Sequence, residues 1–225
     1  MHEKGHAVYA VDLPGFGKSD EPNGANSGRL ESETIWGTKE YARFVDDYRK
    51  AVGLGDQKIN LIGHSFGGQV SIWYAAFYKK HIKNLILIAA AGVRGELSTR
   101  QKASQAVAKI IKPFKGALDA TGASELAYKV AARLSGNYDY AVATPHMRQV
   151  LKKVVNHDLR SICGRIEAPT LLIWGTQDNL TPLSQGEELA SCIKDSKMVI
   201  IPEAGHSEYK QQPGYFADTI ADFIN

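Results

Sequence analysis

The chain has 225 residues, enough for one substantial core, and its 44% hydrophobic and 23% charged residues are ordinary for a soluble enzyme. A net charge of +3 is too small to indicate a nucleic-acid partner, and no apolar run approaches the roughly 18 residues of a membrane span. The cysteines, Cys163 and Cys192, lack metal or redox spacing. We therefore expect a cytoplasmic protein with reduced thiols, no metal and no cofactor.

The first predicted elements are a strand and a helix. The apolar run His6–Val11 predicts a short strand that ends at Asp12, which we expect to hydrogen-bond within the following turn rather than to act in catalysis. After the polar stretch 23–37, Thr38 is predicted to cap a helix that ends at Gly53. The apolar face of this helix comprises Tyr41, Phe44, Val45, Tyr48 and Val52.

The strongest chemical signal is the stretch Asn60–Gly68, which is typical of a buried strand, a tight turn and a helix. Ser65 lies at the apex of the turn between Gly63 and Gly67, in the pattern Gly-x-Ser-x-Gly. A serine hydroxyl becomes a useful nucleophile when it projects from a strained turn toward a base. Such a turn also brings strand and helix so close that only glycine fits beside it. We predict that Ser65 is a nucleophile.

The remaining elements predict one core with a helical insertion. Another buried strand, Asn84–Ala90, follows, and the order strand, helix, strand favours parallel pairing. Residues 93–165 break that rhythm with three predicted amphipathic helices, and the sheet then resumes before a final helix that begins at Pro213. We therefore divide the chain into a core of residues 1–92 and 166–225 and an insertion of residues 93–165.

The insertion is basic, with 13 Lys and Arg against 5 Asp and Glu in residues 94–165. Such a segment is compatible with anionic substrates or a membrane surface. Its charges are dispersed, so solvated helix faces are the simpler interpretation.

Two residues downstream of Ser65 complete a candidate triad. Asp178 and His206 each follow a predicted strand, and the carboxyl ends of parallel strands meet at one edge of a sheet. His206 would take the Ser65 proton, and Asp178 would hold the imidazole in one tautomer. Asp178 could instead be an ordinary turn residue, Glu203 is a rival acid, and His206 could be a plain loop histidine.

The Ser65 turn, the segment Asp12–Ser19 and the Trp174-Gly175-x-x-Asp178 turn together resemble the α/β-hydrolase superfamily. The resemblance implies a mostly parallel sheet flanked by helices, with residues 93–165 as a helical cap. It implies that Ser65, Asp178 and His206 are catalytic and that the Phe66 backbone N–H binds the oxyanion. His64 and Trp174 would lie at the substrate pocket, His64 without transferring protons.

The resemblance also implies that N-terminal strands of the superfamily are missing from this chain. In the superfamily the strand at residues 6–11 is the fourth of the sheet, and the third lies between it and the fifth. The first three strands, and the His-Gly segment that supplies a second oxyanion donor, have no counterpart here. We favour a chain truncated at its N-terminus. The alternatives are strands supplied by a partner chain, or direct closure of the fourth strand on the fifth.

Serine at the apex favours acyl transfer through a tetrahedral intermediate. We therefore expect a cofactor-free serine hydrolase that cleaves small esters through an acyl-enzyme. The alternatives are a hydrolase of carbon–carbon bonds in aromatic meta-cleavage products and a catalytically weak ligand-binding member of the superfamily. The identity of the substrate and the oligomeric state, a homodimer included, stay open.

Overall fold

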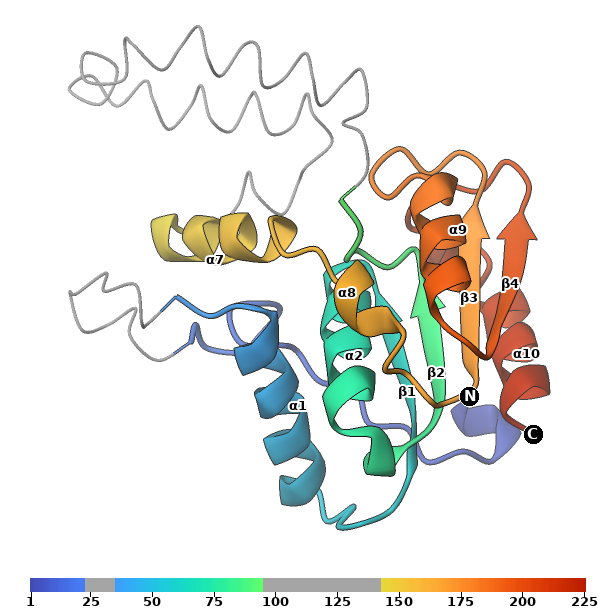
Figure 1. The fold of residues 1–225 in the computed structure, drawn as a ribbon. Coiled ribbons are helices and arrows are strands. Elements are labelled where there is room, and N and C mark those ends of the chain that lie inside the picture. The colour runs from blue at the N-terminus through green and yellow to red at the C-terminus, as the bar shows by residue number, and fades with distance from the viewer. Residues whose placement is uncertain (23–34, 95–142) are drawn as a thin grey trace, which may run out of the picture. The chain divides into compact units, whose positions relative to one another are not determined.

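A computed structural model describes residues 1–22, 35–94 and 143–225 (Figure 1). The chain divides into two compact units, of which one joins Met1–Arg94 to Lys153–Asn225 and the other is Gly95–Lys152. The first unit contains the sheet and the candidate site. In the second, the described residues are 143–152, which form most of one helix.

The described helices and strands are, in order, η1 (His2–Lys4), α1 (Thr38–Ala51), β1 (Ile59–His64), α2 (Phe66–Phe77), η4 (Lys79–His81), β2 (Ile82–Ile88), α7 (Pro145–Val155), α8 (Arg160–Cys163), β3 (Thr170–Gly175), α9 (Leu183–Cys192), β4 (Ser196–Ile201), η6 (Glu208–Lys210) and α10 (Pro213–Ile224). Among these described helices, none is both long and apolar enough to cross a bilayer.

The four described strands form one parallel sheet in the order β1-β2-β3-β4, which confirms the predicted parallel pairing. Ile86 of β2 lies between Ile62 of β1 and Leu171 of β3. The two central strands are buried along almost their whole length, as the continuous apolar runs of parallel strands require.

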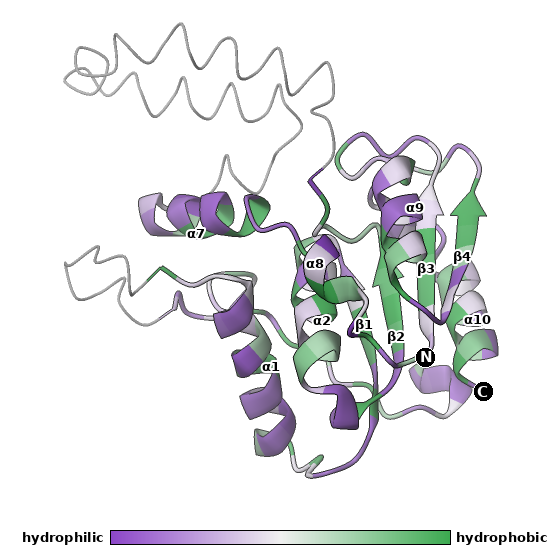
Figure 2. Ribbon diagram, in the orientation of Figure 1, coloured by the Kyte–Doolittle hydropathy of each residue, from purple (hydrophilic) through white to green (hydrophobic). Residues whose placement is uncertain are grey.

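Helices cover both faces of this sheet (Figure 1). Because successive side chains of a strand point to opposite faces, alternate residues of β2 and β3 meet different helices. On one face α10 contributes Phe216, Ile220 and Ile224 to a buried cluster, whose other members are Ile86, Ile88, Leu171, Ile173, Ile201 and Ala204. On the other face α2 contacts β1 and β2, α9 contacts β3 and β4, and α1 packs on α2. Figure 2 shows the result, with apolar central strands and a largely hydrophilic α1.

The predicted strand at residues 6–11 is wrong. The segment has no regular secondary structure, and its apolar residues Val8 and Tyr9 are 56% and 50% exposed. A strand needs a neighbour for its backbone N–H and C=O groups, and none of the described strands pairs with this segment. Direct closure of this strand on the fifth, one of the two alternatives to a truncated chain, is absent from the described residues. The outer edge of β1 is therefore unpaired there, and Ile62 is 43% exposed.

Two helix starts differ by one residue from the prediction. Gly37, not Thr38, caps α1, and the Glu40 carboxylate accepts a hydrogen bond from its backbone N–H at 2.7 Å. Thr38 is the first helical residue, and its hydroxyl lies 3.0 Å from Nδ1 of His157. The Thr181-Pro182 pair likewise predicts a helix with Pro182 in its first position, and the structure has Pro182 as the residue before α9.

The predicted insertion is described only in part. Its third predicted helix is present as α7, and the other two lie outside the described residues. The boundaries 93–165 and the role as a cap stay predictions.

Candidate active site

The turn between β1 and α2 holds Ser65 in a strained conformation. Its φ of 51° and ψ of −116° are values that residues with a side chain rarely adopt. Three backbone hydrogen bonds fix the residue. Its N–H donates to the Ile88 carbonyl at 3.1 Å, and its carbonyl accepts from Ala91 at 2.9 Å and Gln69 at 3.1 Å. The strain is therefore held in place by the ends of two neighbouring elements.

The glycines beside Ser65 differ in how much space a side chain would have. A Cβ on Gly63 would lie 2.5 Å from the Gly67 carbonyl oxygen, and a Cβ on Gly68 would lie 2.4 Å from Cβ of Ala90. A Cβ on Gly67 would meet no atom within 4 Å. The expectation that only glycine fits is therefore correct for Gly63 and wrong for Gly67, and the second crowded position is Gly68.

Asp178 follows β3, and its two carboxylate oxygens contact different groups. Oδ1 accepts the backbone N–H groups of Leu180 and Thr181, both at 2.9 Å. Oδ2 faces the Thr181 hydroxyl at 2.9 Å and Nδ1 of His206 at 2.8 Å. Asp178 is thus a turn residue that bonds its own backbone and, at the same time, the partner of a histidine.

The charge of this buried carboxylate is stabilised by its partners. Burial alone would raise the pKa of Asp178, but His206 and the Thr181 and Leu180 N–H groups outweigh it and hold the pKa below its ordinary value. The side chain of Asp178 is fully buried and that of His206 is 13% exposed. An ionised acid therefore orients Nδ1 of a histidine whose other nitrogen, Nε2, is left for a second partner.

The rival acid does not compete for His206. Glu203 follows β4 with a φ of 60° and is exposed, and its backbone N–H donates to the Thr176 hydroxyl at 2.9 Å. Within the described part of the chain, the ion pair of His206 is with Asp178.

His64 connects the Ser65 turn to the loop of His206. Its Nε2 lies 2.8 Å from the His206 carbonyl oxygen, and its ring lies 4.8 Å from the ring of His206 and 4.7 Å from that of Tyr209. Because a carbonyl only accepts, Nε2 of His64 must carry the proton. Burial lowers the pKa of His64, which favours the neutral form. His64 thus anchors the histidine loop, and its contact with substrate stays a prediction.

His64, the residue before Ser65, contacts His206. Within the described residues no hydrogen bond joins the Ser65 hydroxyl to His206. Such hydrogen bonds are often long before substrate binds.

Comparison with known proteins identifies the family. The sequence profile of the alpha/beta hydrolase fold matches residues 2–119 and 99–213. The chain belongs to the α/β-hydrolase fold family. This confirms the resemblance and the fold class that the sequence motifs indicated.

Curated relatives of this α/β-hydrolase include monoacylglycerol lipases. The chain is 29% identical to monoacylglycerol lipase abhd6-A of Xenopus laevis, over 97% of its own length and 67% of that protein's. It is 28% identical to monoacylglycerol lipase ABHD6 of Homo sapiens, over 96% of its own length and 67% of that protein's. The chain is therefore related to hydrolases at low identity.

Solved structures share its fold. A hydrolase from Pseudomonas aeruginosa PA01 is 25% identical, with a TM-score of 0.65 over 95% of this chain and 78% of that chain. A meta-cleavage product hydrolase from Pseudomonas fluorescens IP01 has a TM-score of 0.64 over the same shares, at 19% identity. The second likeness shows the fold alone.

The remaining predicted site residues differ in how they are placed. Phe66 is the first residue of α2, so its backbone N–H is one of those at a helix start that have no partner within the helix. Trp174 is 1% exposed, its indole N–H donates to the Thr181 carbonyl at 2.7 Å, and its ring packs against Gly186. These contacts give Trp174 a packing role and no support for a place in the substrate pocket.

Sequence reasoning missed two residues that support the histidine. The Thr181 hydroxyl lies 2.9 Å from Oδ2 of Asp178 and 3.1 Å from the Ala89 carbonyl oxygen. Tyr209 packs against His64. A threonine three residues after an aspartate is a local hydrogen-bonding pattern that could have indicated Thr181. Nothing local indicates Tyr209, since its contact depends on the fold.

Proposed function

We propose that this α/β-hydrolase is a serine hydrolase that cleaves carboxylic esters with Ser65, His206 and Asp178. The observation that carries the proposal is the 2.8 Å contact between Nδ1 of His206 and Oδ2 of Asp178. That contact orients a histidine beside the strained Ser65 turn, and a nucleophile, a base and an orienting acid are the parts that acyl transfer requires.

In the proposed mechanism the Ser65 hydroxyl attacks the ester carbonyl while Nε2 of His206 removes its proton. The tetrahedral intermediate carries its negative charge on the former carbonyl oxygen, which the Phe66 backbone N–H stabilises. His206 then gives the proton to the leaving alcohol, and an acyl group remains on Ser65. Water, activated by the same histidine, releases the acid. Asp178 stays ionised throughout and stabilises the protonated imidazole.

The relatives suggest a substrate class. Monoacylglycerol lipases are 28–29% identical over nearly the whole chain, so we propose acylglycerol and similar lipid esters as the first substrates to test. The smaller esters expected from the sequence belong to the same chemical class. The alternative, a hydrolase of carbon–carbon bonds, is supported only by the likeness of fold to a meta-cleavage product hydrolase.

The test is labelling with a fluorophosphonate, because such probes react well only with a serine whose base and oxyanion site are assembled. We expect the protein to be labelled and Ser65→Ala to take no label. Ser71→Ala is the matched control, since Ser71 is a buried serine of α2, the helix that follows Ser65, and its hydroxyl donates to the Gly67 carbonyl at 2.8 Å. It should be labelled like the wild type.

Turnover of a monoacylglycerol is then measured in the same three proteins. Folded wild-type protein that takes no label and binds a monoacylglycerol without hydrolysing it would contradict the enzyme and favour a ligand-binding protein.

A further inference from the structure

Thr181 contacts both members of the pair formed by Asp178 and His206. Its hydroxyl oxygen lies 2.9 Å from Oδ2 of Asp178 and 3.2 Å from Nδ1 of His206. Its backbone N–H donates to the other carboxylate oxygen, Oδ1, at 2.9 Å. Thr181 is only 6% exposed, so an effect of this residue on the reaction must pass through these two neighbours.

The carboxylate of Asp178 can accept about four hydrogen bonds, two at each oxygen. The N–H groups of Leu180 and Thr181 occupy Oδ1, and the Thr181 hydroxyl and Nδ1 of His206 occupy Oδ2. The side chain of Asp178 is fully buried, so bulk water does not replace a donor that is lost. Thr181 therefore supplies two of the four donors, one at each oxygen, and these keep the carboxylate from rotating away from His206.

The Thr181 hydroxyl has one proton and two acceptors within reach. These are the ionised Oδ2 of Asp178 at 2.9 Å and the carbonyl oxygen of Ala89 at 3.1 Å. A charged acceptor forms the stronger bond, so the proton lies on the side of Asp178. The hydroxyl oxygen then has a lone pair left for the N–H at Nδ1 of His206, whose main acceptor is Oδ2 at 2.8 Å.

The hydroxyl also lies against the segment that holds Ser65. Ala89 follows β2 with a φ of 44° and is 3% exposed. The Ile88 carbonyl accepts the Ser65 N–H, and the Ala91 N–H donates to the Ser65 carbonyl. Thr181 is thus placed between the residues that fix the nucleophile and the pair that would take up its proton.

We propose that Thr181 is a positioning residue of this hydrolase, whose hydroxyl holds Oδ2 of Asp178 on Nδ1 of His206 while the imidazole gains and loses a proton. This role rests on the proposed function, because it belongs to the same mechanism. The contact between the hydroxyl oxygen and Nδ1 strengthens when the imidazole is charged, so it stabilises the transition state more than the bound substrate. Loss of the hydroxyl should therefore lower kcat and leave KM nearly unchanged.

The experiment compares two substitutions of Thr181. Thr181→Val keeps the shape of the side chain and loses the hydroxyl, whereas Thr181→Ser keeps the hydroxyl and loses the methyl group. We expect kcat for a monoacylglycerol to fall about tenfold in Thr181→Val, with KM within about twofold, and to stay within about threefold of the wild type in Thr181→Ser. A residue that only filled space would give the opposite order, because valine keeps the packing and serine leaves a cavity.

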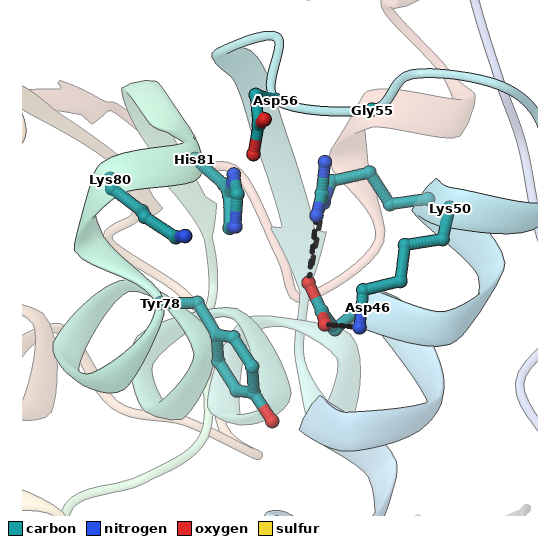
Figure 3. Close-up of a pocket in the computed structure, with 8 residues that line it drawn as sticks. Asp46, Lys50, Gly55, Asp56, Tyr78, Lys80 and His81 are labelled. Carbon is teal, nitrogen blue, oxygen red and sulfur yellow. Dashed lines mark hydrogen bonds and ion pairs between the residues drawn. The ribbon is translucent and has the colours of Figure 1, made fainter.

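Two control variants remove a buried hydroxyl outside the candidate active site. Thr170→Val makes the same change at a threonine that is 1% exposed and donates to the Ala168 carbonyl at 2.9 Å. Tyr74→Phe removes a hydroxyl that donates at 3.1 Å to another buried acid, Asp46. Figure 3 shows Lys50 bonded to that same carboxylate. Both variants should keep kcat within about twofold of the wild type, whatever they cost in stability.

A spectroscopic measurement tests the same role without turnover. The proton on Nδ1 of His206 can be followed by NMR in ¹⁵N-labelled protein, and His206→Gln identifies its signal. We expect the signal in the wild type and in Thr181→Ser. In Thr181→Val the carboxylate is free to rotate, so the proton should exchange with water at least about tenfold faster.

The results separate this role from the proposed function. Active wild-type protein with an equal kcat in Thr181→Val would overturn the positioning role and leave the serine hydrolase intact. Wild-type protein that takes no fluorophosphonate label would contradict the hydrolase, and an unchanged Nδ1 proton signal in Thr181→Val would then still overturn the role of Thr181. A further loss of about tenfold on adding Thr181→Val to Asp178→Asn would also contradict it, because the hydroxyl acts through that acid.

Discussion

Asp178 and Asp46 are equally buried and have different partners. Each is 5% exposed, and each has a pKa held below its ordinary value because hydrogen bonds outweigh the effect of burial. Asp178 meets a histidine, a hydroxyl and two backbone N–H groups. Asp46 meets Arg49, the Tyr74 hydroxyl and, at 2.6 Å, the Nζ of Lys50.

The difference shows that the partners of an acid, and not its burial, indicate its role. Arginine and lysine stay charged at neutral pH, so Asp46 forms permanent ion pairs and contributes to the stability of the fold. Histidine changes its charge near neutral pH, so Asp178 can stabilise a proton that arrives and leaves. Substitution of Asp178 should therefore lower activity, and substitution of Asp46 should lower stability.

The largest effect should come from Asp178→Asn. Asparagine keeps the shape, but its amide cannot stabilise a charged imidazole or hold the required tautomer. We expect kcat for a monoacylglycerol to fall about 10⁴-fold, with folding retained. Steady-state hydrolysis and circular dichroism measure the two quantities. A variant with activity within tenfold of the wild type would contradict the role of Asp178, and Glu203→Gln serves as a control that should keep full activity.

Asp46→Asn should instead lower the free energy of unfolding and leave kcat nearly unchanged. It leaves the buried guanidinium of Arg49 without its counter-ion, and breaking a buried pair costs about 3–5 kcal/mol in free energy of unfolding. Urea denaturation measures this change, and kcat below the unfolding transition should stay within about threefold of the wild type. Asp47→Asn is the matched control, because Asp47 is exposed on the same helix. An equal loss of stability in both variants would contradict the structural role of Asp46.

The sequence predicted the parts of the molecule that depend on local pattern. Apolar runs located β3 and β4, and the ends of these strands placed Asp178 and His206 near enough for the structure to join them by a hydrogen bond. The segment 6–11 failed because an apolar run does not show whether a neighbouring strand is present to pair with it.

Contacts between distant segments could not be predicted in this way. Arg49 and Tyr74 come from different helices, and either residue alone is typical of an ordinary helix surface or core. Gly68 was missed for the same reason, since its crowding comes from Ala90 beyond the next strand.

The smallest effect concerns pH and the stability that Asp46 provides. Its pKa in the folded protein lies below the ordinary 3.8, so the unfolded chain binds the proton more readily. The stabilisation is therefore complete well above pH 3.8 and is lost as the pH falls through the folded value. We expect the difference in unfolding free energy between wild type and Asp46→Asn to be constant from about pH 7 to 5. Below that range it should shrink by up to about 1.4 kcal/mol per pH unit, as urea denaturation at a series of pH values would measure. A difference that shrinks between pH 7 and 5 instead would mean that a histidine carries the effect, and the contrast between a permanent and a titrating partner would fail for Asp46.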